Sequence, residues 1–326
     1  MTDKIIVIDT LGSDEGAESI ILGALASLNA HKDLSICLIG PKTLIESKIK
    51  ELRIDPSKVE IVDTEECITN YENPMTAIMS KPNSSLVKAL KKVDDDNRYI
   101  GLITAGNSGA IIMGSARFLL TKDRTRPCMA ACLPNAKGSF TCVVDTGATI
   151  DVTAYQLVEF AKLGSEFMKK TYKIPSPKVG LLSNGAEPTK GNKLVKEAHP
   201  LLKEVESINF VGNIEGNKAL SGDCDVLVCD GFAGNQVLKN TEGTAKLLIM
   251  DLIKYAKVNN KPEYMDAAKY LMSKYDISTL GAAIVLGIRK PILKIRGNSS
   301  SETVINATGM LLNFNAGDSL FEGKFN

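Results

Sequence analysis

The 326-residue sequence has no tryptophan, only two histidines and only 5% aromatic residues. It also has almost no net charge, because 39 lysines and arginines stand against 38 aspartates and glutamates. A chain this close to neutrality has no bulk field to attract nucleic acid or an anionic membrane. No run approaches the ~20 apolar residues that span a bilayer, and the first residues have no cleavable signal pattern. We therefore expect a cytoplasmic protein with the composition of an ordinary enzyme.

The cysteines indicate neither a disulfide framework nor a metal site. They are seven in number and contain no CxxC pair. Cys37, Cys142 and Cys229 lie in apolar, strand-like runs, where cysteine behaves as a small hydrophobe. Cys128 and Cys132 are four residues apart, but neither histidine is near them in sequence. We expect buried thiols, with no metal and no cofactor.

Several catalytic signatures are also absent. No GxGxxG follows the first predicted strand, and there is no GxxxxGK[ST] and no GxSxG elbow. With two histidines, a Ser/His or Cys/His nucleophile is disfavoured, and His199, which precedes Pro200 in a helix-like segment, is expected to be structural. The remaining amides, carboxylates and one lysine suit direct displacement. In that reaction an anionic nucleophile is positioned and an oxyanion stabilised without a covalent enzyme intermediate.

Strand-like and helix-like segments alternate along the chain. Alternation of this kind predicts parallel pairing with right-handed crossovers, and therefore an α/β fold, a three-layer α/β/α sandwich with a mostly parallel sheet. The strands are continuous apolar runs, as a sheet covered on both faces requires. We predict one domain over residues 1–326. The predicted strands are 5–8, 35–39, 59–62, 100–103, 140–144, 179–182, 208–211 and 226–229, and the helices are 17–28, 43–52, 84–93, 111–120, 154–170 and 193–205.

The stretch 236–275 breaks this alternation. Apolar residues fall on one face of a first helix, and after Pro262, which suits a helix start, on one side of a second. We predict a helical hairpin inserted at about 244–275. Its apolar face is expected to pack on the domain or a dimer mate, with contact to a membrane or an acyl chain as the alternative. Further apolar runs at 280–286 and 292–295 and a last helix near 302–312 close the domain.

Polar, glycine-bearing segments follow five predicted strands, at 104–110, 145–148, 183–192, 212–216 and 230–235. In an open parallel sheet, ligands bind outside the carboxyl ends of the strands, so we expect these loops to meet at one cleft. Several lead into helices, whose N-terminal amides suit an anion such as phosphate. Each loop alone is compatible with an ordinary turn, but five at one edge indicate a ligand site. The candidate residues are Asn107, Ser108, Gly109, Asp145, Asn184, Glu187, Lys190, Asn192, Asn213, Glu215, Asp230 and Asn235.

Four of these stretches resemble one known family. TAGNSGA at 104–110, KVGLLSNGAEPTKGNK at 178–193, INFVGNIEG at 208–216 and DVLVCDGFAGNQVLKNTEG at 225–243 resemble the PlsX-type phosphate acyltransferases. The similarity runs from Asp9 to about Ala307, nearly the whole chain. The block at 178–243 is long and specific.

The resemblance implies a bacterial enzyme that transfers a fatty acyl group from acyl-carrier protein to inorganic phosphate, giving acyl phosphate for phospholipid synthesis. It also implies a homodimer with a fold similar to isopropylmalate dehydrogenases and phosphotransacetylases. The hairpin would serve dimerisation and contact with the inner face of the cell membrane. A glycerol-phosphate acyltransferase is a further implied partner.

Four residues depart from the family pattern. The opening DxMGGD appears as DTLGSD, with Ser13 for a glycine, and Met79 replaces an arginine before two serines. Thr149 replaces the asparagine of a GANVD motif, and Arg296 replaces the histidine of an HGSS-like motif. Arginine binds phosphate well but cannot act as a base near neutral pH, so we expect a mechanism that does not use that histidine as a base. The opening segment also resembles the acyl-phosphate-forming α subunit of glycine reductase component C.

The first functional hypothesis is a phosphate acyltransferase. Phosphate would lie against the loop amides near Asn107 and Ser108, with Lys190 neutralising charge, and would attack the thioester carbonyl. An asparagine would donate to the oxyanion (Asn184, Asn192 or Asn213). Asp145 or Asp230 would orient phosphate, handle a proton or order the loops, and Glu187 and Glu215 would hold Lys190. The remaining predicted substrate contacts are Asp9, Gly109, Asn235 and Arg296.

Three alternatives stay open. The four departures favour a paralogue that forms a short-chain acyl phosphate, such as acetyl phosphate, from another thioester. The hairpin is compatible with a catalytically weak protein that binds carrier protein or acyltransferase at the membrane. A dehydrogenase of the similar fold has the least support, because the dinucleotide fingerprint is absent.

Overall fold

The computed structural model describes residues 4–122, 124–275 and 282–316. Its contacts divide the chain into two compact units. Unit 1 contains the described residues up to Met129 together with residues 282–316, and unit 2 contains residues 130–275. The prediction of one domain over the whole chain stays a prediction, and each unit is described by itself below.

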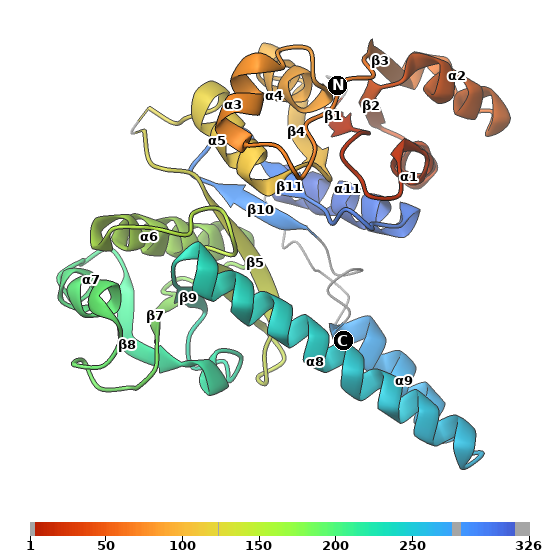
Figure 1. The fold of residues 1–326 in the computed structure, drawn as a ribbon. Coiled ribbons are helices and arrows are strands. Elements are labelled where there is room, and N and C mark those ends of the chain that lie inside the picture. The colour runs from red at the N-terminus through yellow and green to blue at the C-terminus, as the bar shows by residue number, and fades with distance from the viewer. Residues whose placement is uncertain (1–3, 123, 276–281, 317–326) are drawn as a thin grey trace. The chain divides into compact units, whose positions relative to one another are not determined.

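Unit 1 is built on a mostly parallel sheet with the strand order β3-β2-β1-β4-β11-β10 (Figure 1). The last pair, β10 and β11, is antiparallel, and the other pairs are parallel. Residues 6–8 in the centre of this sheet have no exposed surface, which agrees with their uninterrupted apolar sequence. The strands are β1 (Lys4–Asp9), β2 (Leu34–Gly40), β3 (Val59–Asp63), β4 (Tyr99–Thr104), β10 (Ala283–Leu286) and β11 (Ile292–Lys294).

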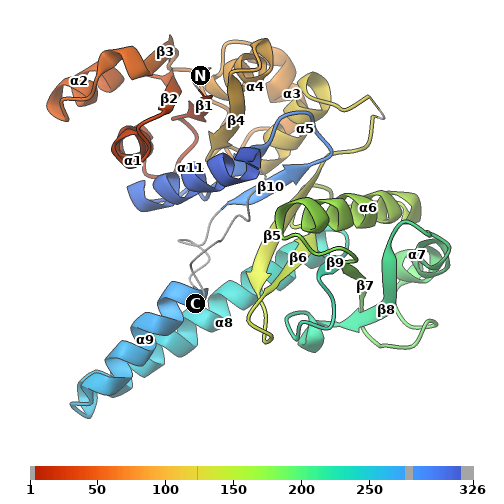
Figure 2. The same ribbon diagram turned by 180° about the vertical axis from the view of Figure 1, so that it is seen from behind.

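Helices cover both faces of the unit 1 sheet (Figures 1 and 2). The chain runs outward from β1 to β3 and then returns to β4 on the other side of β1. Right-handed crossovers in opposite directions place their helices on opposite faces. Accordingly, α1 packs with α11, whereas α4 packs on β1 and β4 and against α5. The helices are α1 (Ala17–Ala30), α2 (Lys42–Glu51), α3 (Pro74–Ser80), α4 (Ser85–Asp95), α5 (Ser108–Phe118) and α11 (Ser301–Ala316).

Unit 2 repeats this plan with the strand order β5-β6-β9-β7-β8. Here β5 and β6 are antiparallel and the remaining pairs are parallel. One face carries a core cluster that includes Leu133, Val143 and Leu227, against which Val237 and Leu238 of α8 pack. On the other face α6 lies so close that a Cβ at Gly164 would be 2.7 Å from Val226. The strands are β5 (Cys128–Pro134), β6 (Phe140–Val144), β7 (Lys178–Ser183), β8 (Asn209–Glu215) and β9 (Val226–Val228).

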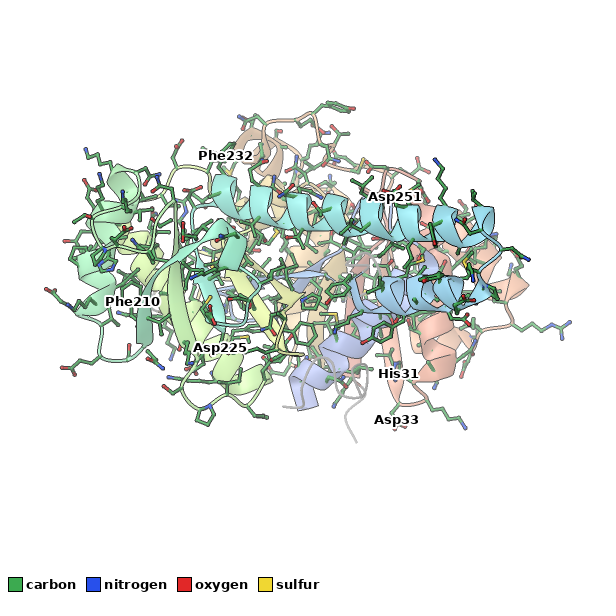
Figure 3. All side chains as sticks on the ribbon, turned by 90° about the horizontal axis from the view of Figure 1, so that it is seen from below. His31, Asp33, Phe210, Asp225, Phe232 and Asp251 are labelled. Atoms are coloured by element: carbon green, nitrogen blue, oxygen red, sulfur yellow. The ribbon has the colours of Figure 1, made fainter. Side chains whose placement is uncertain are left out.

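The helices of unit 2 are α6 (Ala154–Thr171), α7 (Lys193–Lys203), α8 (Gly231–Val258) and α9 (Pro262–Tyr275). α8 and α9 lie side by side as a hairpin (Figures 1 and 3). α8 begins directly after β9, so the helix of the hairpin also contributes to the unit 2 core. Phe232 in its first turn is 61% exposed (Figure 3). Within the ranges that the structure describes, no helix is long and apolar enough to cross a bilayer.

The predicted α/β/α sandwich with a mostly parallel sheet is confirmed. Several local predictions were wrong. The segment 230–235 was predicted as a loop, but α8 begins at Gly231 and includes most of it. β5 was missed, and two of the thiols expected to be buried, Cys67 and Cys132, are half-buried. β8 continues to Glu215, so most of the segment 212–216 is strand rather than loop. Gly212 sits at a bulge in this strand with φ +95°, and that backbone turn had favoured a loop in the sequence. Leu280 and Gly281, at the start of the predicted run 280–286, lie outside the described residues.

Candidate active site

Each unit has one topological switch point, where the strand order reverses. In unit 1 it lies between β1 and β4, and in unit 2 it lies between β7 and β9. Open α/β sheets bind ligands outside the carboxyl ends of the strands at such points, because the flanking loops diverge to opposite faces and leave a crevice. The loops after these four strands, together with the first turns of the helices that follow them, contain most of the candidate residues.

In unit 1 the site begins with Asp9, the last residue of β1, which is 1% exposed. Its carboxylate accepts hydrogen bonds from the Thr104 hydroxyl at 2.9 Å and the Leu11 amide at 3.1 Å, and a further bond from Ser85. Thr104 in turn accepts from the Gly106 amide at 3.0 Å. Burial raises the pKa of Asp9 to about 6, and the hydrogen bonds oppose part of that rise. Asp9 thus ties the loop after β1 to the loop after β4.

The same two loops touch backbone to backbone. Gly12 has φ +86°, and a Cβ there would lie 2.9 Å from the Cα of Gly106. The β4 loop then enters α5, where the Asn107 side chain caps the helix by accepting from the Ala110 amide at 3.0 Å. Its Nδ2 donates to the Thr69 carbonyl at 3.2 Å. Both polar atoms of the buried Asn107 side chain are therefore occupied by hydrogen bonds that hold the loop. The first-turn amides of Ser108 and Gly109, by contrast, have no hydrogen-bond partner within the helix.

Two of the four departures lie near each other in unit 1. The Ser13 hydroxyl donates to the Gly297 carbonyl at 2.6 Å, and Gly297 directly follows Arg296. The Asp14 amide donates to the same carbonyl at 2.8 Å. Ser13 therefore adds a bond between the two loops that the family's glycine would lack. Met79, by contrast, is 59% exposed on α3, and the structure gives no reason for its replacement of an arginine.

In unit 2 the loop after β6 is organised by the fully buried Asp145. Its carboxylate accepts from the amides of Gly147 at 3.1 Å, Ala148 at 2.9 Å and Thr149 at 2.8 Å. Three backbone donors on one carboxylate make a stiff loop. Thr149 joins this set through its main-chain amide, which the replaced asparagine would supply equally.

This loop packs against the start of α8. Asp230 caps the helix by accepting from the Ala233 amide at 2.8 Å. The Gly231 amide donates to the Thr149 carbonyl at 2.8 Å. A Cβ at Gly234 would overlap the Asp145 carbonyl oxygen, so only glycine allows this approach. Asn235 lies on the next turn, with its side chain nearest to Gly147.

The loop 183–192 reaches further into solvent. Asn184 accepts from the Gly191 amide at 2.8 Å, and Asn192 caps α7 by accepting from the Val195 amide at 2.9 Å. Lys190 is exposed. No ion pair joins it to Glu187 or to Glu215 within the described parts of the chain, so the suggestion that these carboxylates hold Lys190 finds no support.

Asn213 joins this loop to β8. It is 7% exposed, and its Nδ2 donates to the Glu187 carbonyl at 2.8 Å. Its buried Oδ1 has no hydrogen-bond partner among the residues that the structure describes. Because Asn213 lies within β8 and faces the backbone of the loop, its evident role is to hold the loop against the sheet. Glu215 is the last residue of the same strand and is half-buried.

A pocket of about 560 Å³ lies at the unit 2 switch point. Of the predicted residues, Asn184, Asn192 and Asp230 line it, whereas the lining does not include Lys190 or Asp145. The remaining walls are mostly apolar, and these residues were not predicted because apolar residues in helices and strands resemble core residues in the sequence. The further lining residues are Leu157, Leu181, Leu182, Ser183, Gly191, Leu194, Val195, Gly216, Cys229, Ala233 and Val237.

Two side chains of types common in catalysis, Cys229 and His199, have structural surroundings here, and His199 does not line the pocket. Burial raises the pKa of the Cys229 thiol well above its ordinary value, and its Sγ donates to the Asp145 carbonyl at 3.6 Å. Burial lowers the pKa of His199, which packs edge-on against Phe210 with ring centroids 5.2 Å apart. In the described ranges no group of three or more His, Cys, Asp or Glu side chains could hold a metal ion.

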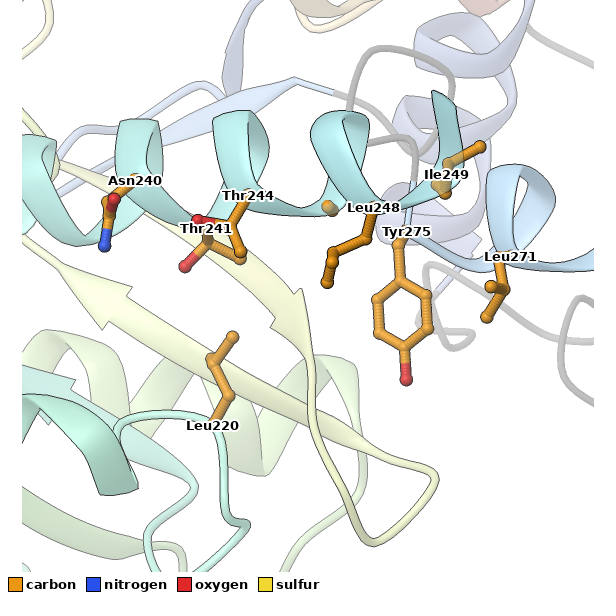
Figure 4. Close-up of a pocket in the computed structure, with 9 residues that line it drawn as sticks. Leu220, Asn240, Thr241, Thr244, Leu248, Ile249, Leu271 and Tyr275 are labelled. Carbon is orange, nitrogen blue, oxygen red and sulfur yellow. The ribbon is translucent and has the colours of Figure 1, made fainter. Parts of the chain in front are cut away.

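A second pocket, of about 400 Å³, lies beside the hairpin (Figure 4). Leu248 and Ile249 from α8, Leu271 and Tyr275 from α9, and Leu220 line it together with Thr241 and Thr244. None of the predicted site residues is among its lining residues. It belongs to the hairpin and not to the strand-end loops.

The grouping of the candidates is therefore clear within each unit. Unit 1 contains Asp9, Asn107, Ser108, Gly109 and Arg296, and unit 2 contains the rest. Hydrogen bonds and the unit 2 pocket link all four loops of that unit. The prediction that the five loops share one cleft stays a prediction.

Comparison with known proteins points to one family. A model of the family described as "fatty acid synthesis protein" matches residues 5–314. A phosphate acyltransferase of Clostridium perfringens is 35% identical over 319 residues, which cover 96% of this chain and 94% of that protein. A phosphate acyltransferase of Thermoanaerobacter pseudethanolicus is 37% identical over 322 residues, covering 95% and 93%.

Solved structures agree at the level of the fold. A phosphotransacetylase of Streptococcus pyogenes superposes with a TM-score of 0.62 at 15% identity, covering 97% of this chain and 94% of that one. A phosphotransacetylase of Staphylococcus aureus gives 0.59 at 17% identity, covering 97% and 93%. The phosphotransacetylase-like fold that the resemblance implied is thus confirmed. From the family match and the long sequence identities together, the chain belongs to the fatty acid synthesis protein family, the PlsX-type phosphate acyltransferases.

Proposed function

We propose that this protein transfers a fatty acyl group from the thioester of acyl-carrier protein to inorganic phosphate. The observation that carries the proposal is sequence identity of 35–37% over at least 95% of the chain to relatives named phosphate acyltransferase. A phosphate oxygen attacks the thioester carbonyl carbon, the carbonyl oxygen becomes an oxyanion, and the carbon–sulfur bond breaks. The products are acyl phosphate and the carrier thiol.

Phosphate binding is assigned to unit 1. The first-turn amides of α5, at Ser108 and Gly109, point out of the helix with its positive dipole end. The loop that precedes them is held by Asp9, Thr104 and the Gly12–Gly106 contact. An amide nest fixed in this way binds an anion without having to reorganise. Arg296, beside the Ser13–Gly297 bond, adds a permanent positive charge to the same unit.

The chemical groups for the thioester are assigned to unit 2. Lys190 is exposed and carries a mobile positive charge that can stabilise the developing oxyanion. The Nδ2 groups of Asn184 and Asn192 remain available, because the described hydrogen bonds of these side chains use Oδ1. Asp145 and Asp230 accept from backbone amides and act as positioning residues. Phosphate is already an anion, so the attack needs no histidine base.

The hairpin is proposed to join two copies of the chain and to touch the inner face of the cell membrane. Leu247, Leu248 and Met250 on α8 and Tyr270 on α9 are each more than half exposed. Apolar side chains of this size rarely stay in water in such a group. Light scattering tests the dimer and sedimentation with anionic vesicles tests the membrane contact.

The reaction is tested by trapping acyl phosphate with hydroxylamine as the hydroxamate. Acetyl and hexadecanoyl thioesters are offered on both acyl-carrier protein and coenzyme A, with and without phosphate. Phosphate-dependent product from the long-chain carrier thioester is expected. Product from the acetyl thioesters alone would replace the proposal with a short-chain phosphotransacylase. No product from any donor, with the protein folded, would favour a binding protein.

A further inference from the structure

The pocket at the unit 2 switch point has apolar walls from three helices and one strand. Leu157 comes from α6, Leu194 from α7, Val237 from α8 and Leu182 from β7. Leu182, Leu194 and Val237 are half-buried, so part of their apolar surface is left open to the pocket or to solvent, although Leu182 and Val237 also pack on the unit 2 core. Apolar surface left open inside a concave site is stabilised when an apolar ligand covers it.

The chemistry of the lining restricts the ligand. Among the described residues that line the pocket, Asp230 alone carries a charge, and it is negative. A nucleotide or another polyanion would find no cation in these walls. An uncharged, flexible hydrocarbon chain fits them, and the polar lining residues Ser183, Asn184 and Asn192 come from the end of β7 and the loop that follows it.

Ser183 gives the pocket a defined polar end. It is the last residue of β7, and its buried Oγ has no hydrogen-bond partner among the described residues. A buried hydroxyl without a partner costs free energy, which a ligand carbonyl would recover. Gly191 keeps the space beside Ser183 open, because a Cβ there would be 2.4 Å from Val195 and 3.3 Å from the Ser183 Oγ.

The pocket also contains a thiol, and an acyl-enzyme at that thiol is the competing explanation. Cys229 is 4% exposed, and its Sγ donates to the Asp145 carbonyl. A nucleophilic cysteine needs an electropositive, accessible setting, whereas Asp230 follows this one directly. The surroundings of Cys229 therefore favour non-covalent binding of a hydrocarbon chain over an acyl-enzyme at this thiol.

We propose that this pocket binds the hydrocarbon chain of the acyl donor and that the bulk of Val237 and Leu194 limits the chain length accepted. This inference rests on the proposed acyl transfer and adds to it the site of chain recognition. The thioester end lies toward Ser183 and Asn184, and the chain end lies toward Leu157 and Val237. No covalent step is assigned to the pocket.

The test fills the pocket with a tryptophan. The chain has no tryptophan of its own, so Val237→Trp both narrows the pocket and introduces a single tryptophan, whose emission can be excited selectively beside the tyrosines. Each methylene excluded from an apolar site lowers binding about fourfold. We expect kcat/KM for hexadecanoyl thioester to fall about tenfold or more, while butyryl thioester and the KM for phosphate change by less than about twofold.

Two variants complete the experiment. Leu194→Ala widens the same pocket. It should raise kcat/KM for donors longer than hexadecanoyl relative to kcat/KM for hexadecanoyl thioester, which is the opposite direction to Val237→Trp. Val211→Trp is the matched control, because Val211 is 41% exposed on β8 and does not line the pocket. It should keep the wild-type chain-length profile. Hexadecanoate should shift the emission of Val237→Trp and leave that of Val211→Trp unchanged.

The outcomes separate the two proposals. If wild-type protein forms no acyl phosphate from any donor, the proposed function fails, and fatty-acid-induced emission changes still test the pocket. If wild-type protein is active but Val237→Trp and Leu194→Ala, both folded, keep its chain-length profile, the pocket inference alone is overturned. Equal losses for butyryl and hexadecanoyl donors in Val237→Trp would also contradict it.

Discussion

In unit 1 the residues at the switch point are fastened to one another, whereas in unit 2 a stiff inner loop lies next to an exposed outer one. Asp9, Thr104 and Asn107 are all buried, and their side chains form hydrogen bonds with neighbouring backbone groups or with each other. In unit 2 Asp145 is held in the same way, but Lys190 and Asn184 on the next loop are exposed. The same sheet plan therefore supports two kinds of site.

The difference matches the two halves of the proposed reaction. Phosphate is small and has a fixed shape, so a rigid set of backbone amides binds it without a free-energy cost for reorganising the site. An acyl donor has a long, flexible chain, and apolar walls of half-buried side chains can accept it in several conformations. The comparison predicts that changes in unit 1 act on the loop geometry and on phosphate, and that changes in the exposed loop of unit 2 act on turnover alone.

The largest effect is expected at Asp145. Asp145→Ala leaves three backbone amides, one buried and two half-buried, without their acceptor, at ~1–3 kcal/mol each before relaxation, so we expect a loss of about 4 kcal/mol in the free energy of unfolding. Urea denaturation measures it. Asp151→Ala, at an exposed position in the same loop, should change stability by less than ~0.5 kcal/mol. Equal effects of the two variants would mean that the loop is not organised by Asp145.

Asp9 provides the next test through pH. Its pKa is about 6 in the folded protein and 3.8 when unperturbed, so between these values the folded state binds more protons than the unfolded state. The free energy of unfolding should therefore fall as pH rises from about 4 to about 6, by ~3 kcal/mol, and then level off.

Asp9→Asn should remove this part of the pH dependence, because an amide does not titrate. Subtracting the variant's curve from the wild-type curve cancels the other carboxylates, whose contributions are common to both. A difference curve that rises with pH, or that is flat, would contradict a buried carboxyl with a raised pKa.

The sequence predicts an element well where local sequence pattern determines it, and poorly where pairing with a distant strand determines it. Strand runs such as 35–39 and 140–144 are local apolar patterns, and they matched β2 and β6 within a residue or two. β5 was missed because its pairing with β6 is antiparallel, outside the βα rhythm. β8 was cut short because Gly212 resembles a turn, and only the partner strand shows that it is a bulge.

The same holds for the site. The polar residues at strand ends were found, because Gly, Asn and Asp after an apolar run are visible in one dimension. The roles of these residues were not predicted correctly. Asn107, Asn192 and Asp230 resemble ligand-binding residues, but their side-chain oxygens cap helices. The apolar walls of the pocket could not be predicted, because Leu157 and Val237 look like core residues in the sequence. Only the packing of four elements brings them to one pocket.

Lys190 tests the chemistry of the exposed loop. Lys190→Met removes a charge that the proposed mechanism uses on the oxyanion, so kcat should fall about a hundredfold. The thermal midpoint should stay unchanged, because no ion pair to Lys190 exists in the described ranges. Lys196→Met on α7, also exposed, should keep wild-type turnover. Unchanged turnover in Lys190→Met would remove this lysine from the mechanism.

The smallest effect compares one glycine from each unit. Gly12→Ala places a Cβ 2.9 Å from the backbone of Gly106 at a φ of +86°, so it strains the loop that precedes the α5 amides. We expect a loss of about 2 kcal/mol in stability and a raised KM for phosphate, with the chain-length profile unchanged. Gly216→Ala, where a Cβ would meet nothing within 4 Å, should leave stability and phosphate KM unaltered. If Gly12→Ala instead changed chain-length preference and spared phosphate, the division of labour between a rigid unit 1 and an adaptable unit 2 would be wrong.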